Sequence, residues 1–122
     1  MKDTSRKQVV RKVMETPRPA GLYAVRNVQT GRLLFGATPD LDGMLNRQRF
    51  QLDMGSHPDK ELQADWNQLG SDAFAFEILD RLDLKDVATV NLMEDLRVLK
   101  ALWLERFEGR GAALYGWSLR GA

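Results

Sequence analysis

The alternation of apolar and polar positions predicts a β-hairpin near the start of the chain. Apolar residues on both sides of the turn sequence NVQTGR predict strands at about residues 21–27 and 32–37. Ahead of the hairpin, valines at helical spacing within a charged stretch predict a helix at about residues 4–15. This helix is expected to end before the sequence PRP, because proline disfavours helix at its own position and at the preceding one.

The rest of the chain predicts three helices and one more strand. The helices are expected at about 39–54, 60–69 and 92–107, and the alternating sequence AFAFEIL predicts a strand at about 73–79. Thr38 is expected to cap the first of these helices. The helix side chains expected to face the core are Leu41, Leu45, Leu52, Leu62, Trp66, Leu69, Leu92, Leu96, Leu99, Trp103 and Phe107, with Met44 and Phe50 close by.

This order of elements predicts an α/β protein of the α+β type, with a small three-stranded sheet between helices. At 122 residues, the chain has the length of one domain that buries its own core. We divide it into a basic N-terminal helical segment, residues 1–18, and a folded domain, residues 19–122.

Composition excludes several classes of function. The chain has no cysteine, which excludes disulfides and thiolate metal sites. No apolar run approaches the roughly 20 residues that a membrane span needs, and the polar first residues do not form a signal-peptide core. A cytoplasmic location without membrane contact is therefore expected.

The charges are distributed unevenly along the chain. The net charge is only +1, but residues 1–18 contain six basic and two acidic side chains. Such a segment can attract the phosphate backbone of nucleic acid. It can equally be a solvated amphipathic helix whose valines pack inward, either on the body of the protein or on another copy, so the oligomeric state stays open.

Two glycines and a tyrosine single out the hairpin as the first candidate for a site. Gly21 and Gly36 lie inside the predicted strands, where a glycine usually marks close approach by another backbone or by a ligand. Tyr23 is either a functional phenol or an aromatic side chain packed on a half-buried strand.

Several phrases of the sequence resemble the GIY-YIG nuclease domain. GLY begins at Gly21, LFG follows after ten residues, and the phrase GSHPDKELQADW and the strand FAFEIL come later. The longer stretch MLNRQRFQLDMGSHPDKELQADWNQLGSDAFAFEILDRL is similar to small bacterial stand-alone members of that family. The likeness runs from Gly21 to about Trp117 and implies a three-stranded antiparallel sheet flanked by helices.

The resemblance also implies metal-dependent hydrolysis of a phosphodiester. In this chemistry a tyrosine acts as base or positions water, an arginine stabilises phosphate charge, and a glutamate holds one divalent metal. Tyr23 matches the first tyrosine of the family. Leu34 stands at the second tyrosine, Met44 at the arginine and Lys100 at the glutamate, so three of the four roles lack their side chain.

Two basic residues offer partial replacements. Arg47 lies about one helical turn beyond Met44, from where its long side chain can reach the cleft. Lys100 cannot ligate a metal and repels one; it is either a surface lysine or a cation that holds a phosphate in place of the metal. We expect Tyr23, Arg47 and Lys100 to face one shallow concavity.

The sequence therefore predicts a catalytically degenerate GIY-YIG-like domain that binds nucleic acid, with DNA favoured over RNA. The candidate residues are Tyr23 and Arg47 in catalytic positions, and Arg49, His57 and Lys100 as nucleic-acid contacts. No cofactor or metal site is expected. One alternative is an active divergent endonuclease, which would require magnesium or manganese. A second alternative is a protein-interaction module.

Histidine and tryptophan each have a structural and a functional interpretation. His57 either contacts phosphate or fixes the turn before a helix, and the turn is favoured because the sequence supplies no partner ligands. Trp66 and Trp103 are expected to anchor the core, since both lie in helical apolar stripes. Trp117, near a glycine-rich end, is compatible with either core packing or base stacking.

Overall fold

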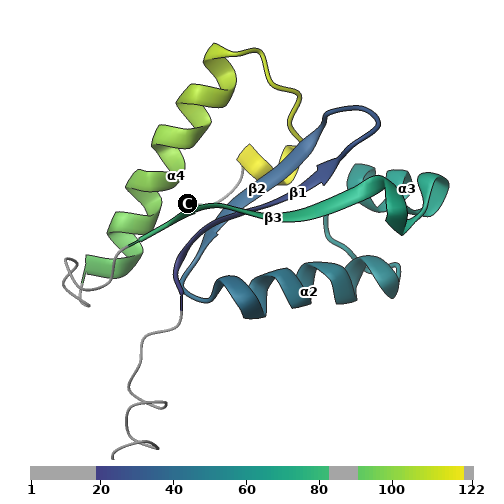
Figure 1. Ribbon diagram of the computed structural model, residues 1–122, viewed down its shortest axis with the longest axis horizontal. Coiled ribbons are helices and arrows are strands. Elements are labelled where there is room, and N and C mark those ends of the chain that lie inside the picture. The colour runs from purple at the N-terminus through teal and green to yellow at the C-terminus, as the bar shows by residue number, and fades with distance from the viewer. Residues whose placement is uncertain (1–18, 83–90, 120–122) are drawn as a thin grey trace, which may run out of the picture.

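A computed structural model of the chain describes residues 19–82 and 91–119 (Figure 1). The basic segment 1–18, with its expected helix at 4–15, lies outside the described residues. The division of the chain after residue 18 therefore stays a prediction. No helix among the described residues combines the length and the apolar character that crossing a membrane requires.

The three strands form one antiparallel sheet in the order β2-β1-β3. Strand β1 (Gly21–Asn27) pairs with β2 (Leu33–Thr38) on one side and with β3 (Phe74–Arg81) on the other. The hairpin and the third strand are thus confirmed, and β3 continues two residues beyond its expected end.

The helices cover both faces of this sheet (Figure 1). Helices α2 (Leu41–Asp53) and α3 (Lys60–Leu69) lie on one face, and α4 (Leu92–Gly109) lies on the other. Two single turns of 3-10 helix, η1 (Ser71–Ala73) and η3 (Gly116–Leu119), complete the described elements. All three helices occur where their apolar spacing predicts them.

The cap expected at the start of α2 is wrong by two residues. Asp40 caps the helix, since its Oδ1 accepts the backbone N–H of Gly43 at 3.1 Å. A carboxylate satisfies this N–H and also lies at the positive end of the helix dipole. Thr38 instead fixes the approach, because its Oγ1 accepts the Asp40 N–H at 3.1 Å.

The alternation of side chains along the strands creates two cores. Tyr23 and Val25 point toward α2 and α3, while Ala24 between them points toward α4. The larger core contains Tyr23, Val25, Leu34, Leu41, Leu52, Leu62, Trp66, Ala73, Phe74 and Tyr115, and the smaller contains Ala24, Leu33, Phe35 and Phe107. Phe50 was expected near the inward face but is 65% exposed, because it lies about 200° around the helix from Leu52.

The segment from Ala113 to Ser118, called the C-terminal segment below, covers the free edge of β2. Leu33 donates its N–H to the carbonyl of Ala113 at 3.0 Å and accepts the N–H of Tyr115 at 2.9 Å. Ser118 Oγ accepts the N–H of Phe35 at 3.0 Å. An edge strand otherwise offers its backbone groups to other chains. This pairing also brings η3 beside the larger core.

Candidate functional site

A cavity of about 250 Å³ opens between the hairpin, α2 and the start of α3. The hairpin contributes one residue from each strand, α2 contributes four, and the turn before α3 and the helix η3 contribute the rest. The lining residues are Tyr23, Leu34, Met44, Arg47, Gln48, Gln51, His57, Pro58 and Trp117. The structure therefore brings Tyr23, Arg47 and His57 together, as well as Trp117.

The two hairpin glycines make room for neighbouring groups of the protein itself. A Cβ on Gly36 would lie 2.7 Å from the phenolic oxygen of Tyr23, which is its partner across the two strands. A Cβ on Gly21 would lie 2.1 Å from the carbonyl oxygen of Asp80 in β3. Both distances are far below normal contact; the expected approach of another backbone is confirmed at Gly21, whereas Gly36 is approached by a side chain and not by a backbone or a ligand. The approaching groups are a side chain and a backbone.

Tyr23 is buried at 8% exposure, and burial governs the ionisation of its phenol. Burial raises the pKa of Tyr23 to about 12, although the positive charge of Arg47 acts in the opposite direction. At neutral pH the phenol is therefore protonated. It can donate a hydrogen bond to an anion, but it is poorly suited to act as a phenolate base.

Arg47 supplies the positive charge of the cavity. It lies on α2 with an exposed side chain, close enough to Tyr23 to influence its pKa. Within the part of the chain that the structure describes, Arg47 has neither an ion pair nor a hydrogen bond through its guanidinium. Its donors are thus available to an anionic group that enters the cavity.

His57 is buried, and its ring holds the turn between α2 and α3. Its Nδ1 accepts the backbone N–H of Asp59 at 2.9 Å, so Nε2 carries the proton and donates to Gln48 Oε1 at 2.6 Å. Burial lowers the pKa of His57, although Asp59 acts in the opposite direction. The imidazole is neutral with both nitrogens in use, which supports the turn-fixing role over contact with phosphate.

Two buried glutamines complete this connection, and they were not among the sequence candidates. Gln63 accepts the His57 N–H at 3.0 Å and donates to the Leu52 carbonyl at 3.0 Å, which ties α3 to the end of α2. Gln48 falls on the helical stripe of Leu41 and Leu52. A polar residue at an inward position of an apolar stripe was the available signal for it.

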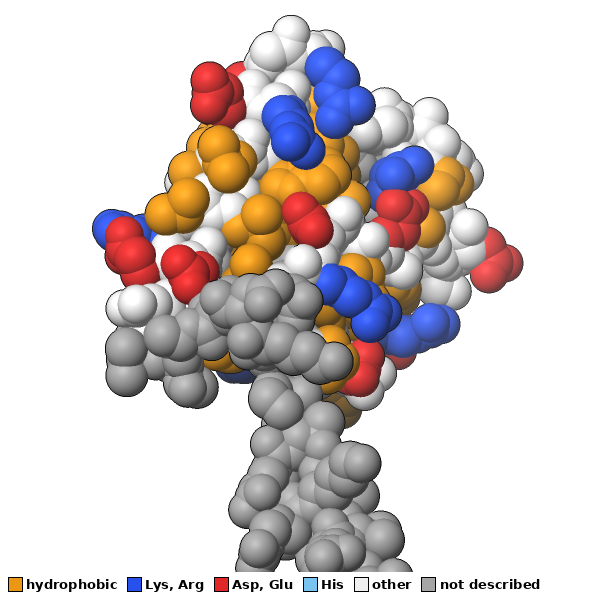
Figure 2. Space-filling view, turned by 60° about the vertical axis from the view of Figure 1, so that its left-hand side comes forward, with side chains coloured by type: hydrophobic (Ala, Val, Ile, Leu, Met, Phe, Trp, Pro, Cys, Tyr) orange, Lys and Arg blue, Asp and Glu red, His pale blue; other side chains and the backbone are white. Residues whose placement is uncertain are grey.

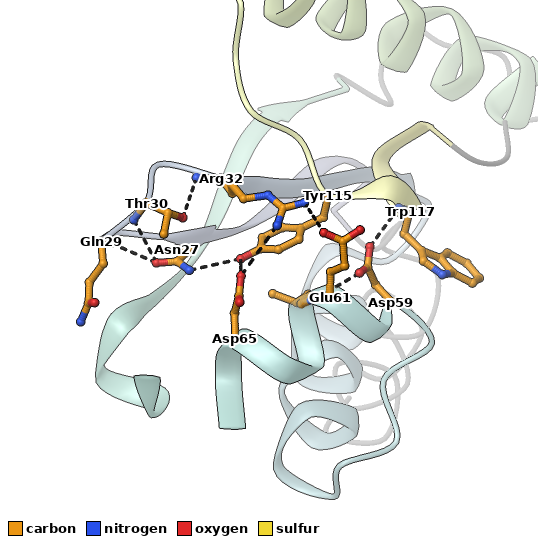
Figure 3. Close-up of polar contacts among 10 residues, drawn as sticks. Asn27, Gln29, Thr30, Arg32, Asp59, Glu61, Asp65, Tyr115 and Trp117 are labelled. Carbon is orange, nitrogen blue, oxygen red and sulfur yellow. Dashed lines mark hydrogen bonds and ion pairs between the residues drawn. The ribbon is translucent and has the colours of Figure 1, made fainter. Parts of the chain in front are cut away.

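Trp117 reaches the cavity because three hydrogen bonds hold the C-terminal segment around Tyr115 and Trp117 in place (Figure 3). Its backbone N–H donates to Asp59 Oδ2 at 3.0 Å, while Asp59 Oδ1 caps α3 by accepting the Leu62 N–H at 3.0 Å. Nearby, the hydroxyl of Tyr115 donates to Asp65 Oδ2 at 2.6 Å and accepts from Asn27 Nδ2 at 3.2 Å. The backbone of Trp117 is thus held in place, while the residue as a whole is 38% exposed to solvent.

Arg49 and Lys100 do not line this cavity. The Arg49 guanidinium lies 5.6 Å from the centre of the Phe76 ring. The Lys100 ammonium lies 5.8 Å from the centre of the Phe35 ring, on the face covered by α4, and burial lowers its pKa. Lys100 lies beside Phe35, whereas Tyr23 packs with Leu34, and these two consecutive residues of β2 point to opposite faces of the sheet. The expectation that Lys100 shares a concavity with Tyr23 is therefore wrong.

The metal that the resemblance implies does not fit the residues present. Among residues 19–82 and 91–119, no group of three or more His, Asp or Glu side chains is placed to hold a metal ion. Counted over the described residues, the lining of the cavity contains no carboxylate, and its one histidine uses both ring nitrogens within the protein. No catalytic step through a metal can be built from these side chains.

The outer surface of α4, on the other side of the sheet from the cavity, exposes apolar side chains to solvent. Figure 2 shows that side of the molecule, where apolar side chains are scattered among charged ones. Met93, Val98 and Leu102 of α4 are each at least half exposed.

Comparisons with known proteins find a likeness of fold. No protein-family model matches the chain, and no curated protein matches its sequence. Among solved structures, the catalytic domain of the homing endonuclease I-TevI is similar, with 20% identity and a TM-score of 0.57, over 79% of this chain and 95% of that one. A mutant of the same domain, described as the catalytic domain of an intron endonuclease, matches with 19% identity and a TM-score of 0.57, over 78% and 90%. The chain has a GIY-YIG-like, nuclease-like fold, and the expected fold class is confirmed.

Proposed function

We propose that this protein binds the phosphodiester backbone of nucleic acid, DNA in the first place, at the cavity lined by Tyr23 and Arg47, and that it does not cut the strand. The observation that carries this proposal is the exposed guanidinium of Arg47 beside a protonated phenol. A guanidinium donates two parallel hydrogen bonds to a phosphate, and a phenol can donate a third. The similar solved structures are domains of an endonuclease, an enzyme that acts on nucleic acid.

The lining of the cavity supports binding without hydrolysis. Leu34 and Met44 occupy the positions where the resemblance implies a second tyrosine and an arginine, and both line the cavity with apolar groups. The raised pKa of Tyr23 leaves little phenolate at neutral pH. Hydrolysis of a phosphodiester needs a base and cations that neutralise the charge developing on phosphate. One arginine and one protonated phenol meet only part of that requirement.

The test compares two arginines of the same helix. Fluorescence anisotropy of a labelled DNA oligonucleotide is measured with the intact chain, with Arg47→Gln and with Arg49→Gln. We expect Arg47→Gln to weaken binding by roughly tenfold, the effect of a charged hydrogen-bonding pair worth about 1.5 kcal/mol. Arg49→Gln removes the same charge from outside the cavity and should have a clearly smaller effect. Equal losses would show that α2 contributes only diffuse charge and that the cavity is not the site.

Cleavage assays separate the alternatives. The chain is incubated with single- and double-stranded DNA in the presence of magnesium or manganese, and we expect the DNA to remain intact. Metal-dependent cleavage that disappears in Tyr23→Phe would establish the divergent endonuclease instead. If no binding is found even at low salt, the nucleic-acid proposal fails. The exposed apolar side chains of α4 then become the first surface to examine for a protein partner.

A further inference from the structure

A second cavity lies directly beside the first. It has a volume of about 310 Å³, begins at the start of α3 and is lined by Pro58, Asp59, Lys60, Glu61, Gly116 and Trp117. Only Pro58 and Trp117 line both cavities. Trp117 therefore adjoins two neighbouring hollows on the surface of the protein.

The position of this residue is set by the rest of the fold. Asp59 accepts the Trp117 backbone N–H at 3.0 Å (Figure 3). Ser118, the next residue, is fully buried against β2. Trp117 itself is 38% exposed. A large aromatic ring on a fixed backbone at the rim of two hollows can stack on a planar ligand at small entropic cost, because only two side-chain torsions need to be ordered.

A cationic side chain lines the cavity on each side of Trp117. Arg47 lines the first cavity and Lys60 lines the second, and in the described part of the chain neither has an ion pair. The acidic residues of the second cavity have partners within the protein. Asp59 accepts two backbone N–H groups, and Glu61 pairs with Arg32 at 2.9 Å (Figure 3).

A cation on each side of an exposed aromatic residue suits the binding of single-stranded nucleic acid, which combines charged phosphates with bases that are free to stack. Successive phosphates can meet Arg47 and Lys60 while a base between them stacks on the ring. In a duplex the bases are already stacked on one another and paired, so their faces cannot reach an aromatic ring at the protein surface. Resting on the function proposed above, we propose that Trp117 is a base-stacking residue and that the protein selects single-stranded DNA over duplex DNA.

Binding to two probes tests this proposal. The first is a labelled oligothymidylate of about a dozen nucleotides, within the usual site size of single-strand binders, and the second is a duplex of the same length. We expect tighter binding of the single strand. Trp117→Ala should weaken that binding by about 5- to 150-fold, the effect of losing one base–aromatic stack, and should change duplex binding much less.

Conservative variants distinguish stacking from a structural effect. Trp117→Phe should retain most of the affinity for the single strand, whereas Trp117→Leu, which keeps an apolar side chain without a ring, should not. Phe50→Leu is the matched control, since Phe50 is an exposed aromatic residue of α2 that lines neither cavity, and it should bind like the intact chain. Equal affinities of Trp117→Phe and Trp117→Leu would overturn the proposal.

Tryptophan fluorescence supplies an independent readout. We expect the oligothymidylate to quench the emission of the intact chain, and the quenching to disappear in Trp117→Phe while anisotropy still reports binding. Quenching that persists in that variant would overturn the stacking role. Binding of duplex and single strand with the same affinity, unaffected at position 117, would also overturn it and leave the nucleic-acid function standing. Absence of binding to either probe would refute both proposals.

Discussion

Tyr23 and Gly36 face each other across β1 and β2, and the phenol of Tyr23 occupies the space that a side chain at position 36 would need. The absent Cβ of one residue thus allows the other to lie buried beside Arg47. The cavity depends on this pair, because Tyr23 forms part of its wall.

Gly36→Ala is therefore expected to destabilise the protein by about 1–3 kcal/mol, as overpacking of a core does. The change is measured by urea denaturation. Gly109→Ala is the control, since a Cβ there meets nothing within 4 Å; because Gly109 is the last residue of α4, alanine should leave the stability unchanged or raise it by up to about 1 kcal/mol. In the Tyr23→Phe background Gly36→Ala should lower the free energy of unfolding by less, because the phenolic oxygen closest to the new Cβ has been removed. An unchanged loss of stability would show that the two residues are not coupled.

The two tyrosines of the chain should titrate unusually late. Burial raises the pKa of both Tyr23 and Tyr115 to about 12, from an ordinary value near 10, and the hydrogen bond of Tyr115 to Asp65 adds to the effect. Absorbance of tyrosinate in the folded protein should rise with a midpoint near 12, and in the urea-unfolded chain near 10. Tyr23→Phe and Tyr115→Phe should each remove about half of the amplitude, since the chain has two tyrosines.

The same shifts determine the stability of the protein in alkali. Because the unfolded chain releases these protons first, it binds fewer protons than the folded one above pH 10. Below about pH 10 the contribution of the tyrosines to the free energy of unfolding should not change with pH. As the pH rises from about 10 to about 12, the free energy of unfolding should fall. A folded protein whose tyrosines ionise near pH 10 would contradict the burial of both phenols.

His57 should make the protein sensitive to mild acid. Burial lowers the pKa of His57 below its ordinary value of 6.5, so the unfolded chain takes up a proton at a pH where the folded imidazole is still neutral. The unfolded state then binds more protons, and the free energy of unfolding should decrease as the pH falls through about 6.5. Urea denaturation between about pH 7.5 and 5.5, within which histidine is the side chain that normally titrates, measures this decrease.

His57→Gln is the matched variant, because it removes the single histidine of the chain. The variant is expected to be less stable at pH 7, since the Asp59 N–H and Gln48 lose their partner. Its stability should, however, be flat over the same pH range. A pH dependence that remains unchanged in His57→Gln would mean that the histidine is not buried in a neutral form.

The sequence located the helices and strands well because the signals for them are local. The alternating residues of the hairpin and the apolar spacing of α3 and α4 lie within single elements, and Gly70 ends α3 where expected. The cap of α2 was harder to place, since Thr38 and Asp40 are both good capping residues. Only the backbone path out of β2 decides which of the two meets the first free N–H groups.

The candidate site could be predicted in part. Tyr23 and Arg47 were found because the resemblance supplies one position and helical spacing supplies the other. Lys100 was misplaced because a match between sequences does not say which face of the sheet a helix covers. Gln48 could have been found from its place in the stripe with Leu41 and Leu52, but a polar residue there becomes informative only when its partner His57 is known.

What the sequence determined by itself is the set of elements, the alternation that gives the sheet two apolar faces, and the glycine positions where groups approach closely. The tertiary structure alone decided which side chains meet in the cavity. Trp117 lies there because its N–H bonds to Asp59, 58 residues away, and because Ser118 bonds to Phe35, 83 residues away. Contacts over such separations depend on how the elements pack together, and no local pattern of residues encodes that packing.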